Sequence, residues 1–199
     1  MKKLTLLSTG LCLLLIGSSI AFAQDTMAPP KVLVIQREFL KPGRAGSMHL
    51  KTESAFVRAM TAAKWPTHYF AMDSLSGPSR SLFFIAYPSF EAWEKDILAT
   101  QNNATLSAAF DRAGIADGDL LNLYESSAFV YREDMSLRAA VNIAQMRYFE
   151  IMQFVVRPGH DKEWETLVKM YTDGFGKNVP DAHWAVFEKI GRASCRERV

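Results

Sequence analysis

An internal repeat at an offset of 116 residues is the feature that most constrains this 199-residue chain. Ile35 to Arg44 (IQREFLKPGR) aligns with Ile151 to His160 (IMQFVVRPGH), and both segments carry an apolar run followed by a basic residue, a proline and a glycine. With a one-residue slip, His68-Tyr69 aligns with His183-Trp184. The same order of strand, turn, helix and His-aromatic strand, found twice, predicts two copies of one structural unit.

The first copy, residues 32–132, has the pattern of a βαββαβ unit. A β-rich run over Val32 to Leu40 ends at the Pro42-Gly43 turn. Apolar residues recur at helical spacing from Gly46 to Lys64. The remaining expected elements are strands over Thr67 to Asp73 and Arg80 to Tyr87, a helix capped by Ser89, a loop over Ala113 to Asp119 and a strand over Leu120 to Arg132. This order predicts the ferredoxin-like α+β fold, an antiparallel sheet with its helices on one face.

The second copy, residues 147–189, is a truncated version of the first. A strand is expected over Arg147 to Val156, a helix over Asp161 to Phe175 and a strand from His183 to Glu188. Residues 24–31 and 133–146 are then linkers. Because Leu82 to Tyr87 is apolar in both alternating phases, both faces of the first sheet should be buried. We therefore expect two tandem ferredoxin-like units to form an intramolecular barrel, with homodimerisation as an alternative way to cover an incomplete surface.

Both ends of the chain are expected to lie outside the folded domains. Residues 1–23 have the pattern of a secretory signal peptide, with Lys2-Lys3 before an apolar stretch and Ala21-Phe22-Ala23 at the cleavage site. Residues 190–199 (IGRASCRERV) resemble a translated sequencing adapter. The signal-like pattern leads us to expect a bacterial protein that is periplasmic or secreted. No later run reaches 18 apolar residues, so we expect no membrane anchor after signal cleavage.

Removing these two ends changes the charge and the cysteine count. The ends hold five basic residues and one acidic residue, so the formal net charge of the remaining part is −2 instead of +2. This balance argues against a nucleic-acid partner. Both cysteines, Cys12 and Cys195, also lie in the ends, which excludes disulfides, thiolate metal sites and cysteine nucleophiles from the central part.

The strand followed by Leu40-Lys41-Pro42-Gly43-Arg44 and a helix resembles the dimeric α+β barrel superfamily, in particular its NIPSNAP-like and antibiotic-biosynthesis-monooxygenase-like members. The resemblance covers residues 31–132 and, in truncated form, 147–189. It implies a ligand cleft between sheet and helices, and members of the superfamily include haem-degrading and quinone-forming oxygenases.

Phe90-x-x-Trp93 is similar to the Phe-x-x-Trp of the haem-degrading members, whose tryptophan lines the haem cleft. The axial histidine that the resemblance implies is replaced by Asn103, and the first-strand asparagine by Gln36. No cofactor and no metal are therefore predicted, with haem kept as an alternative.

His68 and His183 are the candidate catalytic residues, because they recur at equivalent points of the two copies. A histidine near a barrel interior can act as a general base, since its ordinary pKa is close to neutrality. The alternative is that each histidine ends its helix-to-strand connection and bonds to the backbone. His49 lies at the border of the apolar stripe of its helix, with Glu53 four residues on, a spacing that can orient a histidine or stabilise a surface helix. We expect the surface role for His49, and an exposed position at the start of a helix for His160.

A small apolar or aromatic molecule is the expected ligand, because aromatic side chains are frequent among the candidate cleft residues. The candidate binding residues are Trp93, Tyr69, Arg37, Trp65, Phe84 and Trp184. Trp93 alternatively belongs to the core, beside Phe90 and Ile97. The leading hypothesis is an exported ligand-binding protein; the alternatives are a monooxygenase-like enzyme and a structural or interaction module.

Overall fold

The computed structural model describes residues 26–191, so the proposed signal peptide and the adapter-like residues 192–199 lie outside the described part. Its strands are β1 (Val32–Leu40), β2 (Tyr69–Asp73), β3 (Arg80–Tyr87), β4 (Leu121–Leu137) and β5 (Trp184–Lys189). Its α-helices are α1 (Ser47–Ala62), α2 (Phe90–Asn102), α3 (Ala104–Gly118) and α4 (Asp161–Asn178). In the described part, no helix is long and apolar enough to cross a membrane.

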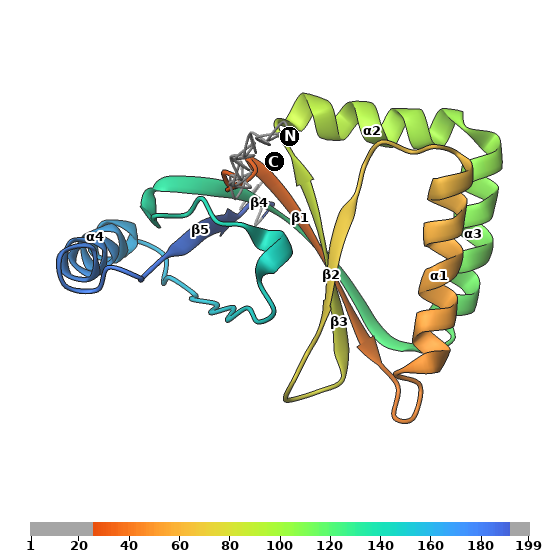
Figure 1. The fold of residues 1–199 in the computed structure, drawn as a ribbon, viewed down its shortest axis with the longest axis horizontal. Coiled ribbons are helices and arrows are strands. Elements are labelled where there is room, and N and C mark those ends of the chain that lie inside the picture. The colour runs from red at the N-terminus through yellow and green to blue at the C-terminus, as the bar shows by residue number, and fades with distance from the viewer. Residues whose placement is uncertain (1–25, 192–199) are drawn as a thin grey trace, which may run out of the picture.

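The strands form a single antiparallel sheet in the order β2-β3-β1-β4-β5. Helices α1, α2 and α3 lie on one side of it, and α1 and α3 run side by side (Figure 1). The predicted α+β, ferredoxin-like class of the first copy is confirmed. Because side chains alternate along a strand, β1 presents Val32, Val34 and Glu38 to the helices and Leu33 and Ile35 to the opposite face, called here the open face.

Each face of the sheet has its own apolar core. On the helix side, Val32, Val34 and Tyr87 are buried against Trp93 and Ile85. On the open face, Leu33, Ile35 and Leu82 are buried. The side chains packed around these three are Met72, Phe84, Phe129 and Phe187. The expectation that β3 is apolar on both faces is thus confirmed.

The prediction of a loop over Ala113 to Asp119 is wrong, because α3 continues to Gly118. The helix tolerates Gly114, because a glycine inside a helix costs only about 1 kcal/mol relative to alanine. Burial of the helix face that carries Ala113 and Asp117 outweighs this cost.

The strand expected over Arg147 to Val156 is also wrong, since this segment forms neither helix nor strand. Its counterpart β1 is stabilised by hydrogen bonds to β3 on one side and β4 on the other. Within residues 26–191, no strand pairs with 147–156, and a strand without a ladder leaves its backbone groups to solvent. Segment 147–156 contacts the first unit through the Phe149 ring, whose centroid lies 5.2 Å from that of Phe70.

The two basic-Pro-Gly turns nevertheless have matching geometry. Gly43 and Gly159 both have positive φ, 75° and 87°. Each turn is closed by an i+3 to i backbone hydrogen bond. Arg44 N donates to Lys41 O (3.0 Å), and His160 N donates to Arg157 O (3.1 Å). His160 begins α4 with a half-exposed side chain, as expected.

Strand β5, from the segment expected to form the second copy, pairs with the C-terminal half of β4 and so extends the sheet at its edge. Arg132 of β4 links the two parts, through hydrogen bonds to Glu188 of β5 (2.7 Å) and Glu165 of α4 (3.4 Å). Arg138 donates to the carbonyls of Gly176 and Val179 near the end of α4. The tandem barrel itself stays a prediction.

Candidate functional site

A buried cluster of one histidine and three carboxylates lies between the sheet and helices α1 and α3. It consists of Glu38 from β1, His49 and Glu53 from α1, and Asp117 from α3. One potential ligand atom from each lies within 4.8 Å of those from the other three. The side chains of Glu38, His49 and Asp117 are only 9%, 7% and 4% exposed. We call these four residues the His49 cluster.

The register of the sheet and the pitch of α1 bring the His49 cluster together. Asp73, Ser81, Glu38 and Tyr124 pair across β2, β3, β1 and β4 in one row. That row presents Glu38 and Ser81 to α1, where residues 49, 52 and 53 follow one another at helical spacing. Between α1 and α3, Thr52 Oγ1 donates a hydrogen bond of 2.6 Å to Asp117 Oδ1, which connects α3 to the cluster.

His49 is held at both ring nitrogens. Its Nε2 lies 2.9 Å from Glu38 Oε2, 3.6 Å from Asp117 Oδ1 and 3.8 Å from Glu53 Oε1. Its Nδ1 lies 3.4 Å from Ser81 Oγ. Because Ser81 donates its hydroxyl proton to Asp73, its oxygen is free to accept Nδ1–H of His49. This arrangement directs Nε2 at the three carboxylates.

The electrostatics of the cluster favour bound protons. The hydrogen bond to Glu38 raises the pKa of His49, against the lowering effect of burial, and the charges of Asp117 and Glu53 add to the increase. Burial raises the pKa of Glu53 to about 8, with Glu38 and Asp117 contributing. Glu53 Oε1 is buried without a hydrogen-bond partner among the described residues. The cluster can therefore hold and release protons near neutral pH.

The surface interpretation of His49 and Glu53 is wrong, because both side chains are turned towards the sheet. The i,i+4 spacing was visible in the sequence, but it does not distinguish a buried pair from an exposed one. The missing signal was the partner set: Glu38 and Asp117 lie far from His49 in sequence, and Asp117 fell in a segment taken for a loop. Only the pairing of β1 with β3 and the packing of α1 on α3 bring them together.

The candidate catalytic histidines are not brought together with the His49 cluster. His68 and His183 are exposed, and each precedes an outer strand of the sheet, β2 or β5. His183 Nδ1 lies 3.0 Å from the carbonyl oxygen of Asp181. His183 also lines a surface cavity of about 550 Å³ between residues 138–146 and 180–183. None of the other candidate residues lines this cavity.

The sheet divides the candidate ligand-binding residues between its two faces. Arg37 and Phe84 lie on the open face, where the Arg37 guanidinium stands 5.8 Å above the Phe129 ring. Tyr69 and Trp93 lie on the helix side, in contact with Phe83 and Tyr87 respectively. Trp184 lies apart on β5 and donates to the carbonyl of Met135 at 3.0 Å.

Trp65 contributes to a polar junction centred on Asp96 of α2. The Asp96 carboxylate accepts hydrogen bonds from Trp65 Nε1 (3.1 Å), Thr67 Oγ1 (2.5 Å) and Tyr87 OH (2.8 Å). Burial and this hydrogen bond raise the pKa of Tyr87. These donors join the connection before β2 and the end of β3 to α2, so Trp65 has a structural role here.

The residues at the haem-related positions do not fit a haem site. Asn103, which stands where the resemblance implies an axial histidine, caps α3 by accepting the backbone N–H of Leu106 at 3.1 Å. Gln36 lies on the helix side of β1, between Val34 and Glu38 on that face. No step of chemistry is therefore assigned to haem.

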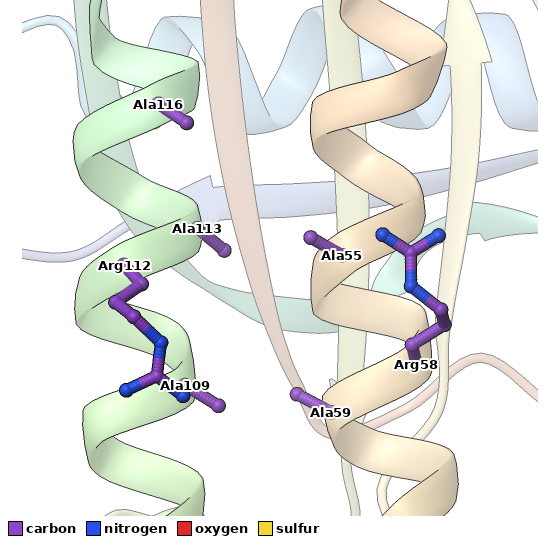
Figure 2. Close-up of a pocket in the computed structure, with 7 residues that line it drawn as sticks. All are labelled: Ala55, Arg58, Ala59, Ala109, Arg112, Ala113 and Ala116. Atoms are coloured by element: carbon purple, nitrogen blue, oxygen red, sulfur yellow. The ribbon is translucent and has the colours of Figure 1, made fainter.

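A groove of about 350 Å³ separates α1 from α3 (Figure 2). Its walls are Ala55, Ala59, Ala109, Ala113 and Ala116, with Arg58 and Arg112. Figure 2 shows the alanine methyl groups of the two helices directed into the space between them. Small side chains at these positions let the two helices approach closely, which in turn brings Asp117 to His49.

No protein-family model and no curated protein matches the chain. Solved structures do match it. A NIPSNAP domain protein from Burkholderia xenovorans is 11% identical with a TM-score of 0.41, over 51% of this chain and 95% of that one. SnoaB, a cofactor-independent oxygenase from Streptomyces nogalater, is 13% identical with a TM-score of 0.36, over 52% and 95%.

FN1347 from Fusobacterium nucleatum, named as a monooxygenase, is 15% identical with a TM-score of 0.44, over 82% of this chain and 76% of that one. Antibiotic biosynthesis monooxygenase proteins also match. The names of these proteins include the NIPSNAP and antibiotic biosynthesis monooxygenase classes that the sequence resembles. At such identities the likeness assigns no activity.

Proposed function

We propose that the chain is an exported protein that binds a small apolar or aromatic molecule, and that the ligand lies on the open face of the sheet. The observation that carries this proposal is the position of α1, α2 and α3 on one side only. The other side is lined with aromatic rings, one of which, Phe70, also contacts Phe149. The rings are Phe39, Phe70, Phe84, Phe129 and Phe187. A mostly apolar surface with few polar groups is typical of small-molecule sites.

Two arginines give this face a preference for an anionic ligand. Arg37 packs over Phe129, and Arg80, opposite Phe39, has a buried Nε without a hydrogen-bond partner among the described residues. A guanidinium offers paired donors to a carboxylate or sulfonate. An aromatic ring that carries such a group would match both the rings and the arginines.

The helix-side candidates support the fold in this proposal. Trp93 stacks on Tyr87, and Trp65 is hydrogen-bonded to Asp96. Tyr69 packs edge-on against Phe83. Because these side chains already pack or hydrogen-bond within the fold, the open-face residues Arg37 and Phe84 are the ones that we expect to bind.

Thermal unfolding with naphthalene-2-sulfonate tests this proposal. We expect a concentration-dependent rise in melting temperature, weaker with neutral naphthalene. Arg37→Gln should weaken binding about tenfold or more, since hydrogen bonds to charged groups contribute about 1.5–3 kcal/mol. Arg58→Gln, an exposed arginine on α1, is the matched control. An equal loss in both variants, or no shift with either compound, would overturn the proposed open-face site.

A monooxygenase-like activity is the second candidate, and the His49 cluster is the observation that favours it. The His49–Glu38 pair can take a proton from an acidic hydroquinone, the step by which a base prepares such a substrate for oxygen. Oxygen uptake with hydroquinones, abolished in His49→Gln and kept in His68→Gln, would support this candidate. If neither the parent chain nor the His68→Gln variant consumes oxygen, the binding function remains as the proposal. A protein partner that copurifies with the chain would instead favour an interaction module.

Export is proposed from the signal-like residues 1–23. Mass spectrometry of the protein recovered from the periplasm or medium of a bacterial host tests it. We expect Gln24 as the first residue. An intact Met1 in the cytoplasmic fraction would contradict export.

A further inference from the structure

We propose that the His49 cluster is a binding site for one divalent first-row transition metal ion. The ligands are Nε2 of His49 and one carboxylate oxygen each from Glu38, Glu53 and Asp117. This site is separate from the open face, because the sheet lies between them. It therefore holds or fails independently of the ligand binding proposed for the open face, whereas the monooxygenase-like candidate uses the same residues.

The spacing of the ligand atoms suits a shared ion. Metal bonds of about 2.0–2.2 Å to nitrogen and oxygen place adjacent ligand atoms about 3.0–3.5 Å apart. His49 Nε2 lies 2.9, 3.6 and 3.8 Å from the three carboxylates. All four potential ligand atoms lie within 4.8 Å of one another, a spacing that one ion can bridge if Glu53 and Asp117 move slightly towards it.

The orientation of His49 is a second, independent observation. Its Nδ1 faces Ser81, which is itself hydrogen-bonded to Asp73, so a hydroxyl and a carboxylate fix the ring from behind. Metal-bound histidines commonly donate their other ring N–H to such partners, which sets the tautomer and frees the opposite nitrogen. Here the opposite nitrogen, Nε2, is the one that faces the carboxylates.

The carboxyl groups of the cluster outnumber its one basic side chain, so either bound protons or a metal ion must offset their charge. Three carboxylates share a space in which Glu38, His49 and Asp117 are more than nine-tenths buried at the side chain. Within residues 26–191, no lysine or arginine forms an ion pair with any of them. The other polar side chains facing the cluster, Thr52, Ser81, Tyr69 and Tyr124, carry no positive charge. Glu53 Oε1, buried and without a hydrogen-bond partner, is the open ligand position.

The donor set selects among metals. One imidazole and three carboxylates without a thiolate suit Mn²⁺, Fe²⁺, Co²⁺ or Zn²⁺. Ca²⁺ and Mg²⁺ prefer all-oxygen sites, so we expect them to bind more weakly.

Calorimetric titration of the untagged, metal-stripped full chain with Zn²⁺ and with Mn²⁺ tests the proposal. One equivalent should bind, and the melting temperature should rise with the ion. Co²⁺ should give a visible absorption band that reports on nitrogen and oxygen ligation. Glu53→Gln keeps the size of the side chain and removes no hydrogen bond at Oε1, so it should fold and bind each ion at least about tenfold more weakly.

The exposed pair His160 and Glu163 on α4 provides the matched control. Its atoms lie 3.7 Å apart, with side chains 59% and 69% exposed. The double variant His160→Ala/Glu163→Gln should bind like the parent chain. Asp117→Asn is the second cluster variant, which keeps an acceptor for Thr52. Unchanged affinity in both folded cluster variants, loss of affinity in the α4 variant, or no binding to the parent chain would overturn the proposal.

Discussion

Glu53 is the residue whose ionisation most strongly links the His49 cluster to stability. Its pKa rises from 4.5 to about 8 on folding, so between these pH values the folded state holds a proton that the unfolded state has released. Stability therefore falls as pH rises through this window. His49 acts in the same direction: a histidine whose pKa is raised on folding stabilises below its ordinary 6.5, and this contribution is lost as pH rises through the folded value.

We expect the urea midpoint of the chain, measured with a chelator present, to fall from pH 5 to pH 8.5. Glu53→Gln should flatten the curve and stabilise the chain by about 1–3 kcal/mol at the upper end, because an amide cannot ionise. Glu163→Gln, an exposed carboxyl on α4, should leave the curve unchanged. Parallel curves for Glu53→Gln and the parent chain would show that Glu53 is already ionised in the folded state.

Substitutions of two glycines, Gly46 at the start of α1 and Gly114 within α3, test the backbone conformation at these positions. Gly46, the N-cap of α1, has φ 72° and ψ −130°, a conformation that side chains with a Cβ rarely adopt. Gly46→Ala should destabilise the fold by about 1–2 kcal/mol. Gly114 lies inside α3 with open space around its missing Cβ, so Gly114→Ala should stabilise by about 0.5–1 kcal/mol. Denaturant unfolding of the two variants should give effects of opposite sign; effects of the same sign would contradict this account.

At the scale of elements, local patterns predicted most of the fold but not the partners. Turn and periodicity signals located β1, α1, β3 and α4 to within a few residues. They failed for 147–156, because a strand needs neighbours that its own sequence does not supply. They also failed for the end of α3, where burial of Asp117 against α1 decides the structure.

The candidate site was predicted less well than the fold, for a physical reason. Aromatic, histidine and arginine residues are recognisable one at a time, so Arg37 and Phe84 are among the predicted binding residues. The His49 cluster depends on contacts between residues as far apart as Glu38 and Asp117, and no spacing in the sequence records such a contact. The i,i+4 pair at His49 was its one local trace.

The contact between α1 and α3 gives a prediction at this scale. Ala113 is 4% exposed and lines the alanine groove between the two helices. Ala113→Leu should force the helices apart and destabilise the fold by about 1–3 kcal/mol. Ala108→Leu, on an exposed face of α3, should have little effect. Equal unfolding midpoints for the two variants would mean that the groove accommodates a larger side chain.

At the scale of the whole molecule, apolar surface is unevenly distributed. The first unit has buried apolar clusters on both faces of its sheet, and exposed apolar side chains such as Leu50 and Ile115 lie on its helices. In segment 148–155, by contrast, all of the large apolar side chains are exposed. Tyr148, Met152 and Val155 are 76%, 67% and 65% exposed. Contiguous exposed apolar surface of this kind favours association with another protein surface.

The last prediction follows from that surface: the chain should self-associate through segment 148–155. Sedimentation velocity over a wide range of concentrations should show a larger species that grows with concentration, since burial of apolar area drives the association. Met152→Ser/Val155→Ser should shift this equilibrium towards the monomer, because it removes two of the most exposed apolar side chains. Leu75→Ser, which changes an 84% exposed leucine in the loop between β2 and β3, should not. If the double variant associates as strongly as the parent chain, the contact lies elsewhere, and the open face of the sheet becomes the surface to test next.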